Sequence, residues 1–270
     1  MKVLNTLNID TALGAVSFVF VASIIKSVEV ELAIYGALVA SVLFIYNLDH
    51  LVDAFKLKDA LSSYRHYFYQ KYFKPLLIWQ GLLFITIIWL LFQLPLKVVA
   101  AGVIMTIFMG IYFLFVFIRS TKNYVLREVV VALGYTFAII IVPFANYPLS
   151  FEMEFIGFST ILFLTALTNL WVFATYEIEM DKIQDHHSIA RKVNTTKMTR
   201  LIKIIIGLDL VLIVLLYVHW SVTISFLVVE LTYFILLERQ HNFRKNDAYR
   251  SIGEAILILP GLLLFVLNAI

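Results

Sequence analysis

The chain has 270 residues, of which 62% are hydrophobic, a formal net charge of +3 and no cysteine. An ordinary soluble domain is only about 45–50% apolar, so this composition excludes a water-facing surface over most of the molecule. A lipid bilayer accommodates the excess, because apolar side chains can then cover the outside of a helical bundle as well as its core. The absence of cysteine excludes a disulfide framework and thiol chemistry.

Apolar stretches follow one another along the chain, each close to the roughly 20 residues that a membrane-spanning helix needs. The stretch from Gly81 to Phe92 is apolar apart from Thr86 and does not alternate, which favours helices over a β-barrel. We therefore expect an all-α membrane protein with about nine transmembrane helices, forming a single domain over residues 1–270. The expected spans are 9–26, 30–47, 75–93, 96–118, 125–145, 153–176, 201–219, 221–238 and 252–269.

The basic residues alternate between the two sides of these spans. All but Lys26 and Lys97 of the 21 Lys and Arg residues fall in the N-terminal segment, in every second loop or at the edges of those loops. Segments with such an excess of bases face the cytoplasm. This predicts a multi-pass protein of the cell (inner) membrane with a cytoplasmic N-terminus and an external C-terminus. The two longer loops, 48–74 and 177–200, are then cytoplasmic.

Both of these loops begin with carboxylates at helical spacing. Asp49 and Asp53 are four residues apart, and Glu177, Asp181 and Asp185 repeat the spacing. Residues four apart share one face of a helix, where carboxylates repel each other unless a cation lies between them. One such stripe is typical of a solvated helix end, but two on the same side favour a shared metal site. Because Mg²⁺ prefers carboxylate and phosphate oxygens, we predict about two Mg²⁺ ions around one diphosphate.

Basic residues close to the acidic motifs are candidates for binding the phosphates. Arg binds phosphate oxygens in a bidentate way, whereas Lys acts as a point charge. Anchoring at the cytoplasmic face explains most of these bases, so we expect only three or four of them to contact a ligand. The candidates are Arg65, Arg119, Lys122, Arg191 and Lys192.

At these motifs the sequence resembles the UbiA superfamily of intramembrane prenyltransferases. Members of that family carry two Asp-rich motifs, N-x-x-x-D-x-x-x-D and D-x-x-x-D. Asp49 and Asp53 match the acids of the first motif, and Glu177 and Asp181 match those of the second. The chain resembles a divergent member, because Glu177 replaces an Asp and Ile45 stands where the family has Asn.

The resemblance implies a UbiA-type bundle with a central cavity that opens near the cytoplasmic side. It implies Mg²⁺-dependent transfer of a prenyl group from an isoprenoid diphosphate to a hydrophobic acceptor, namely an aromatic or quinone-precursor compound. Ionisation of the donor leaves an allylic carbocation, which the acceptor captures. The implied catalytic and metal-binding residues are Asp49, Asp53, Glu177 and Asp181, with Asp185 as a further metal ligand.

Four other residues are candidates. Asn47 is the Asn nearest to the family's motif position and is a candidate for substrate binding, and Tyr135 is another because family members often have a Tyr in the fifth span. Asp209 and Glu230 lie inside late spans, where an acid is by default a functional hypothesis. They are expected either to line the acceptor pocket or to pair with polar groups between helices.

Two other functions stay open at this point. A terpene cyclase on the same scaffold would release diphosphate without any acceptor. A transporter or a non-catalytic membrane protein is the other alternative, but transporters place their polar sites near the middle of the bilayer. Here the acidic motifs lie at the cytoplasmic edge, which favours an enzyme. Nucleic-acid binding has no support, because the bases follow the membrane topology and do not gather on one soluble face.

Overall fold

The computed structural model describes the backbone of residues 2–56, 64–118, 124–146, 153–183, 189–216 and 220–268. Over these residues the chain is helical and contains no strand. The helices are α1 (Lys2–Thr6), α2 (Ile9–Ile25), α3 (Leu32–Lys56), α4 (Tyr64–Lys71), α5 (Phe73–Leu91), α6 (Leu96–Ile118), α7 (Tyr124–Asn146), α8 (Met153–Ile183), α9 (Ile189–Lys192), α10 (Thr195–Leu215), α11 (Trp220–Glu238), α12 (Gln240–Phe243), α13 (Ala248–Ala255) and α14 (Leu259–Asn268), with the 3₁₀ turns η1 (Lys245–Asp247) and η2 (Ile256–Ile258).

The outer faces of the bundle are apolar. On α5, for example, Ile78, Ile85 and Trp89 expose 68%, 63% and 61% of their surface. A continuous apolar face of this kind is stable in lipid and not in water. The protein is therefore a multi-pass membrane protein. In the described residues each expected span overlaps a long helix, except that the last, 252–269, is divided among α13, η2 and α14. Within the described residues, the helical segments both long and apolar enough to cross a membrane are Leu32–Val52, Phe73–Leu91, Met153–Glu179, Trp220–Glu238 and Ala248–Leu267; the total of about nine crossings stays a prediction.

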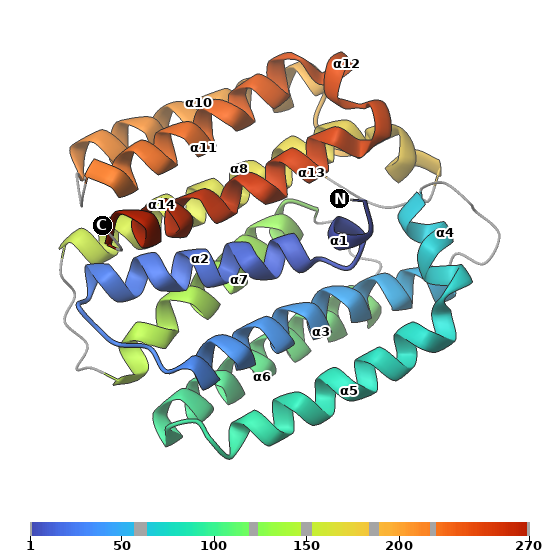
Figure 1. Ribbon diagram of the computed structural model, residues 1–270. Coiled ribbons are helices and arrows are strands. Elements are labelled where there is room, and N and C mark those ends of the chain that lie inside the picture. The colour runs from blue at the N-terminus through green and yellow to red at the C-terminus, as the bar shows by residue number, and fades with distance from the viewer. Residues whose placement is uncertain are drawn as a thin grey trace.

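The long helices lie side by side around α2 (Figure 1). Helix α2 packs against α3, α7, α8 and the C-terminal segment α13–η2–α14. Helix α3 also packs on α5, α6 on α7, α7 on α8, α8 on α10, α10 on α11, and α11 on α14. The first and last long helices of the chain are therefore neighbours. The N-terminus, α1, α4 and α12 lie at one end of the bundle, and the C-terminus lies at the other (Figure 1).

The last helix is interrupted at η2 because Pro260 has no N–H and its ring clashes with the carbonyl of Ile256. Ser17 of α2 bonds two backbone groups at this interruption: its hydroxyl donates to the Ile258 carbonyl at 3.1 Å and accepts from the Gly261 N–H at 2.7 Å. This close approach requires glycine, since a Cβ on Gly261 would lie 2.7 Å from the Ser17 Cα. The contact joins η2 and α14 to α2.

Four acids of the two motifs, Asp49, Asp53, Glu177 and Asp181, lie on the last turns of two long helices and not in loops. Helix α3 continues beyond the expected end of its span to Lys56, and α8 continues to Ile183. Neither extension contains a Pro or Gly that would end the helix. Two further short helices, α4 and α9, occupy other parts of the segments 48–74 and 177–200, so these segments are more helical than expected.

Two residues with a left-handed backbone conformation precede helices at the polar end of the bundle. Asn8 (φ 58°) precedes α2, and Asp247 (φ 55°) precedes α13. Asn and Asp adopt this conformation more readily than other residues with a side chain. The turn at Asn8 separates α1 from α2, which places Asn5 at the same end of the molecule as the acidic motifs.

Candidate active site

A cavity of about 1000 Å³ lies inside the bundle, and α2, α3, α6, α7, α8 and α13 contribute to its wall. Its size suits an extended ligand, since ligand pockets are typically about 300–1,000 Å³. One end is charged and is lined by Asp49, His50, Arg65, Glu177 and Arg250. The remainder is mainly apolar and includes Ile34, Leu38, Leu91, Leu94, Val98 and Ile141.

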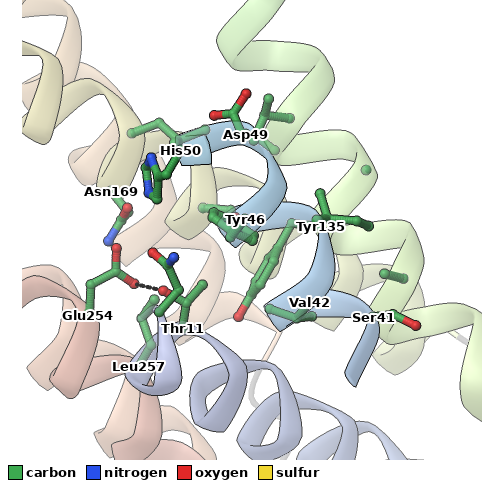
Figure 2. Close-up of a pocket in the computed structure, with 18 of the residues that line it drawn as sticks. Thr11, Ser41, Val42, Tyr46, Asp49, His50, Tyr135, Asn169, Glu254 and Leu257 are labelled. Carbon is green, nitrogen blue, oxygen red and sulfur yellow. Dashed lines mark hydrogen bonds between the residues drawn. The ribbon is translucent and has the colours of Figure 1, made fainter. Parts of the chain in front are cut away.

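The cavity wall begins with charged residues and ends with apolar ones on α3, on α8 and on the segment α13–η2. An α-helix rises about 1.5 Å per residue, so wall residues three or four apart lie about 5–6 Å deeper. Figure 2 shows part of this order, from Asp49 through Tyr46 to Val42 on α3 and from Glu254 to Leu257. From the charged end inward, the order is Asp49, Tyr46, Val42 and Leu38 on α3; Glu177, Phe173, Asn169 and Ala166 on α8; and Arg250 and Glu254 on α13, followed by Leu257 in η2.

The charged end brings together carboxylates from both predicted motifs. Asp49 of α3 and Glu177 of α8 line the same cavity, together with Glu179. Among the described side chains, no group of three His, Asp or Glu residues is arranged to hold a metal ion. The predicted metal ligands Asp53, Asp181 and Asp185 have side chains outside the described part of the structure.

Glu177 is held by two residues of α13. Arg250 Nη2 donates to Glu177 Oε1 in an ion pair, and the Tyr249 hydroxyl donates to the same oxygen at 3.0 Å. The Tyr249 ring stacks on Tyr176, with the ring centroids 4.1 Å apart and the planes 6° apart. Helices α8 and α13 are thus joined by a charge pair and by a ring stack. Among the described residues both hydrogen bonds use Oε1, which leaves Oε2 for a further ligand.

Arg65 of α4 supplies a second guanidinium. Its Nη1 lies 2.9 Å from His50 Nε2, and its Nη2 donates to the backbone oxygen and Oδ1 of Asn5 at 3.2 and 3.3 Å. Because a guanidinium cannot accept a hydrogen bond, His50 Nε2 is the acceptor. Burial, together with the charge of Arg250, lowers the pKa of Arg65 to about 10, against the opposing effect of Glu177. Arg65 therefore remains charged at neutral pH.

Asn47 lies behind the cavity wall. It is 1% exposed, and its Oδ1 accepts hydrogen bonds from Asn8 Nδ2 at 3.3 Å and from the Tyr69 hydroxyl. The Tyr69 hydroxyl is also 3.0 Å from the Thr6 carbonyl oxygen. These contacts join α3 and α4 to the turn between α1 and α2, and so support the positions of Asn5 and Arg65. A direct contact of Asn47 with substrate stays a prediction.

Tyr135 of α7 lines the cavity, and its ring packs edge-on against Phe18 with centroids 6.4 Å apart. Its hydroxyl is buried and has no hydrogen-bond partner among the described residues. The phenol is therefore free to bond a ligand at this depth. The remaining predicted bases cannot be placed: Arg119 and Lys122 lie outside the described residues, as do the side chains of Arg191 and Lys192.

Asp209 and Glu230 do not line the cavity. Both are fully buried where α8, α10 and α11 meet, and the Thr165 hydroxyl donates to Asp209 Oδ2 at 3.0 Å. The Glu230 carboxyl lies beside Asp209. Of the two expectations for these acids, the structure shows pairing between helices.

The wall residues that the sequence did not point to include Thr11, Arg250 and Glu254. The Thr11 hydroxyl donates to Glu254 Oε2 at 3.0 Å, which links α2 to α13 (Figure 2). A usable signal existed for Glu254, because it is an acid inside the expected span 252–269. Arg250 gave no such signal, since its position in a basic loop is explained by topology alone.

No protein-family model matches the chain, and no curated protein matches it. The fold and the cavity define an all-α membrane protein with an internal site that is charged at one end. A solved structure of digeranylgeranylglyceryl phosphate synthase, a UbiA-superfamily intramembrane prenyltransferase, is similar to it with a TM-score of 0.58. The similarity covers 98% of this chain and 96% of that chain at 12% identity. The chain therefore has the UbiA fold, and the resemblance predicted from the acidic motifs is confirmed at the level of the fold.

Proposed function

We propose that the protein is a Mg²⁺-dependent intramembrane prenyltransferase. It takes an isoprenoid diphosphate and transfers the prenyl group to a hydrophobic acceptor, of the aromatic or quinone-precursor kind. One observation carries the proposal: a single cavity begins with carboxylates and guanidinium groups and continues as an apolar channel. This polarity matches a molecule with a diphosphate head and a hydrocarbon tail, and the UbiA fold supports the same function.

The donor set at the charged end suits Mg²⁺. The ion typically binds one or two carboxylates together with phosphate oxygens and water, and Asp49 and Glu177 present carboxylates to the same cavity. Asp53, Asp181 and Asp185 follow at intervals of four residues and are the proposed further ligands. When bound there, Mg²⁺ would neutralise charge on the diphosphate and favour its departure.

The arginines supply the second part of the chemistry. Arg65 and Arg250 present guanidinium groups at the level where the diphosphate would lie, and such groups bind phosphate oxygens bidentately. As the donor C–O bond ionises, negative charge develops on the leaving diphosphate, where these fixed positive groups stabilise it. One level deeper, the rings of Tyr46 and Phe173 line the space beside the allylic cation, and aromatic faces attract cations.

The charged end is proposed to face the cytoplasm of the cell (inner) membrane. Helices α1, α4 and α12 lie at this end of the bundle (Figure 1). The segments that contain them carry bases such as Arg65, Lys71 and Arg244. An excess of bases marks the cytoplasmic side of membrane proteins. A donor made in the cytoplasm could then reach the cavity from that side.

Diphosphate release tests this function directly. Purified protein in detergent is incubated with Mg²⁺ and geranyl, farnesyl or geranylgeranyl diphosphate, with and without 4-hydroxybenzoate as an aromatic acceptor. We expect release by the wild type and a loss of at least about 100-fold in Asp49→Asn. Asp209→Asn is the matched control, because it changes a buried acid outside the cavity.

No release from any donor, or equal release by the wild type and Asp49→Asn, would contradict the proposal. The products separate the remaining alternatives. Release that needs the acceptor and gives a prenylated compound supports a transferase. Release without acceptor that gives a cyclic hydrocarbon supports the terpene cyclase instead.

A further inference from the structure

Glu254 occupies a special position in the cavity, one helical turn inward from Arg250. The two residues are four apart on α13, so Glu254 lies about 6 Å deeper. Tyr46 of α3 and Phe173 of α8 likewise line the cavity about one helical turn inward from Asp49 and Glu177. Figure 2 shows its carboxylate near Thr11 and Asn169, between His50 toward the charged end and Leu257 toward the apolar part.

This depth is where the reacting carbon of a prenyl diphosphate would lie. If the diphosphate binds between Arg65 and Arg250, the first prenyl carbon is attached directly to it and therefore lies at the next level of the wall. A carboxylate at that level is not needed for the metal site and is separate from both acidic motifs. It faces the space in which an acceptor must approach the carbon.

A hydrogen bond orients one carboxylate oxygen of Glu254, and the other oxygen is available to a ligand. Thr11, which is 5% exposed, donates to its Oε2 at 3.0 Å. Its other oxygen, Oε1, makes no hydrogen bond to the described residues. Arg250 is engaged with Glu177, and no other described base forms an ion pair with Glu254. The charged groups that act on it from the surrounding helices are Asp10 of α2, Arg250 of α13 and Arg65 of α4.

The same region offers two more polar groups for an oxygen-containing ligand. Asn169 is held by hydrogen bonds from its Nδ2 to the Tyr233 hydroxyl at 2.8 Å and to the Gly253 carbonyl at 3.4 Å. The buried Tyr135 hydroxyl has no partner among the described residues and lies near Leu257, since both approach Gly14. An ionised carboxylate can only accept hydrogen bonds, so the complementary ligand group is a donor.

We infer that Glu254 is the general base of the transfer reaction and that the acceptor reacts through a hydroxyl group. This rests on the proposed prenyltransferase function. The donor C–O bond breaks and its electron pair leaves with the diphosphate. A lone pair of the acceptor oxygen forms the new C–O bond, and the hydroxyl proton passes to Glu254. The product is an ether. A phenol and an aliphatic alcohol share this chemistry.

The test uses the full chain in detergent with Mg²⁺ and geranylgeranyl diphosphate. One arm contains 4-hydroxybenzoate as a phenol, and the other contains an alkylglyceryl phosphate as an aliphatic alcohol. Glu254→Gln keeps the size of the side chain and can still accept from Thr11, but cannot take a proton. We expect its kcat/KM for transfer to fall by about 100- to 1,000-fold, as for the loss of a general base. The KM for the donor should stay within about twofold.

The pH profile distinguishes a base from a merely structural residue. Wild-type kcat/KM for the acceptor should fall at acid pH, where the carboxylate is protonated, and Glu254→Gln should lack this limb. Thr11→Val is the second variant: it keeps the carboxylate but removes the hydrogen bond that orients it, and we expect a loss of about tenfold. If Glu254→Gln does not fold, Thr11→Val still tests the inference, because unchanged transfer in that variant would contradict it.

Three results would overturn the inference alone: transfer by Glu254→Gln within about twofold of the wild type, an acid limb that persists in that variant, or a product joined through carbon. A wild type that releases no diphosphate from any donor would overturn the proposed function as well. The arm that gives the ether identifies the acceptor as a phenol or as an aliphatic alcohol.

Discussion

The ion pair between Glu177 and Arg250 can be tested by a double-mutant cycle, with Arg250→Met, Glu177→Gln and the combination. Removing Arg250 alone leaves the Glu177 carboxylate with only the Tyr249 hydroxyl as a hydrogen-bond donor among the described residues. Breaking a fully buried pair costs about 3–5 kcal/mol, whereas an exposed pair contributes about 0.2–1 kcal/mol. The side chains of Arg250 and Glu177 are 21% and 28% exposed. We therefore expect a coupling free energy between these limits, about 2 kcal/mol.

Thermal unfolding in detergent at low salt measures this coupling. For a chain of this size, about 2 kcal/mol corresponds to a shift in Tm of roughly 4–8 °C. Arg250→Met should be the least stable of the four proteins, because it leaves an unpaired carboxylate in a partly buried site. Adding Glu177→Gln to it should recover much of the loss. If the two single changes add up in the double variant to within about 0.5 kcal/mol, the pair does not join α8 to α13 as described.

Three further outcomes are expected. Gly261→Ala should destabilise the fold by about 1–3 kcal/mol in the same thermal assay, because its Cβ would lie 2.7 Å from the Ser17 backbone. Gly81→Ala is the control: it has open space around it and should be neutral or slightly stabilising. Tyr69→Phe should cost about 1–3 kcal/mol, because it removes the buried hydroxyl that lies against both the Thr6 carbonyl and Asn47 Oδ1. The half-exposed Tyr67→Phe is its control, and equal Tm values for the two variants would refute this reasoning. Chelation of Mg²⁺ with EDTA should abolish diphosphate release, and added Mg²⁺ should restore it; release that persists in EDTA would contradict the metal requirement.

The amino-acid sequence by itself determined the helical membrane architecture. Membrane-spanning helices are encoded locally, since about 20 apolar residues suffice for one crossing whatever the rest of the chain does. The spacing of four residues in each acidic motif is also a local property. It correctly placed Asp49 and Asp53 on one helix and Glu177 and Asp181 on another. The alternation of bases placed both motifs at the same end of the bundle.

Only the tertiary structure decided which side chains meet in the cavity. Glu254 accepts a hydrogen bond from Thr11, which is 243 positions away in the sequence, and Arg250 donates one to Glu177, which is 73 positions away. Asn47, although next to the first motif, faces Tyr69 and not the cavity. Such pairings depend on the rotation of each helix about its axis and on contacts such as the one between α2 and α14. No spacing within a single helix encodes that rotation, because it is set by packing against neighbours that are distant in the sequence.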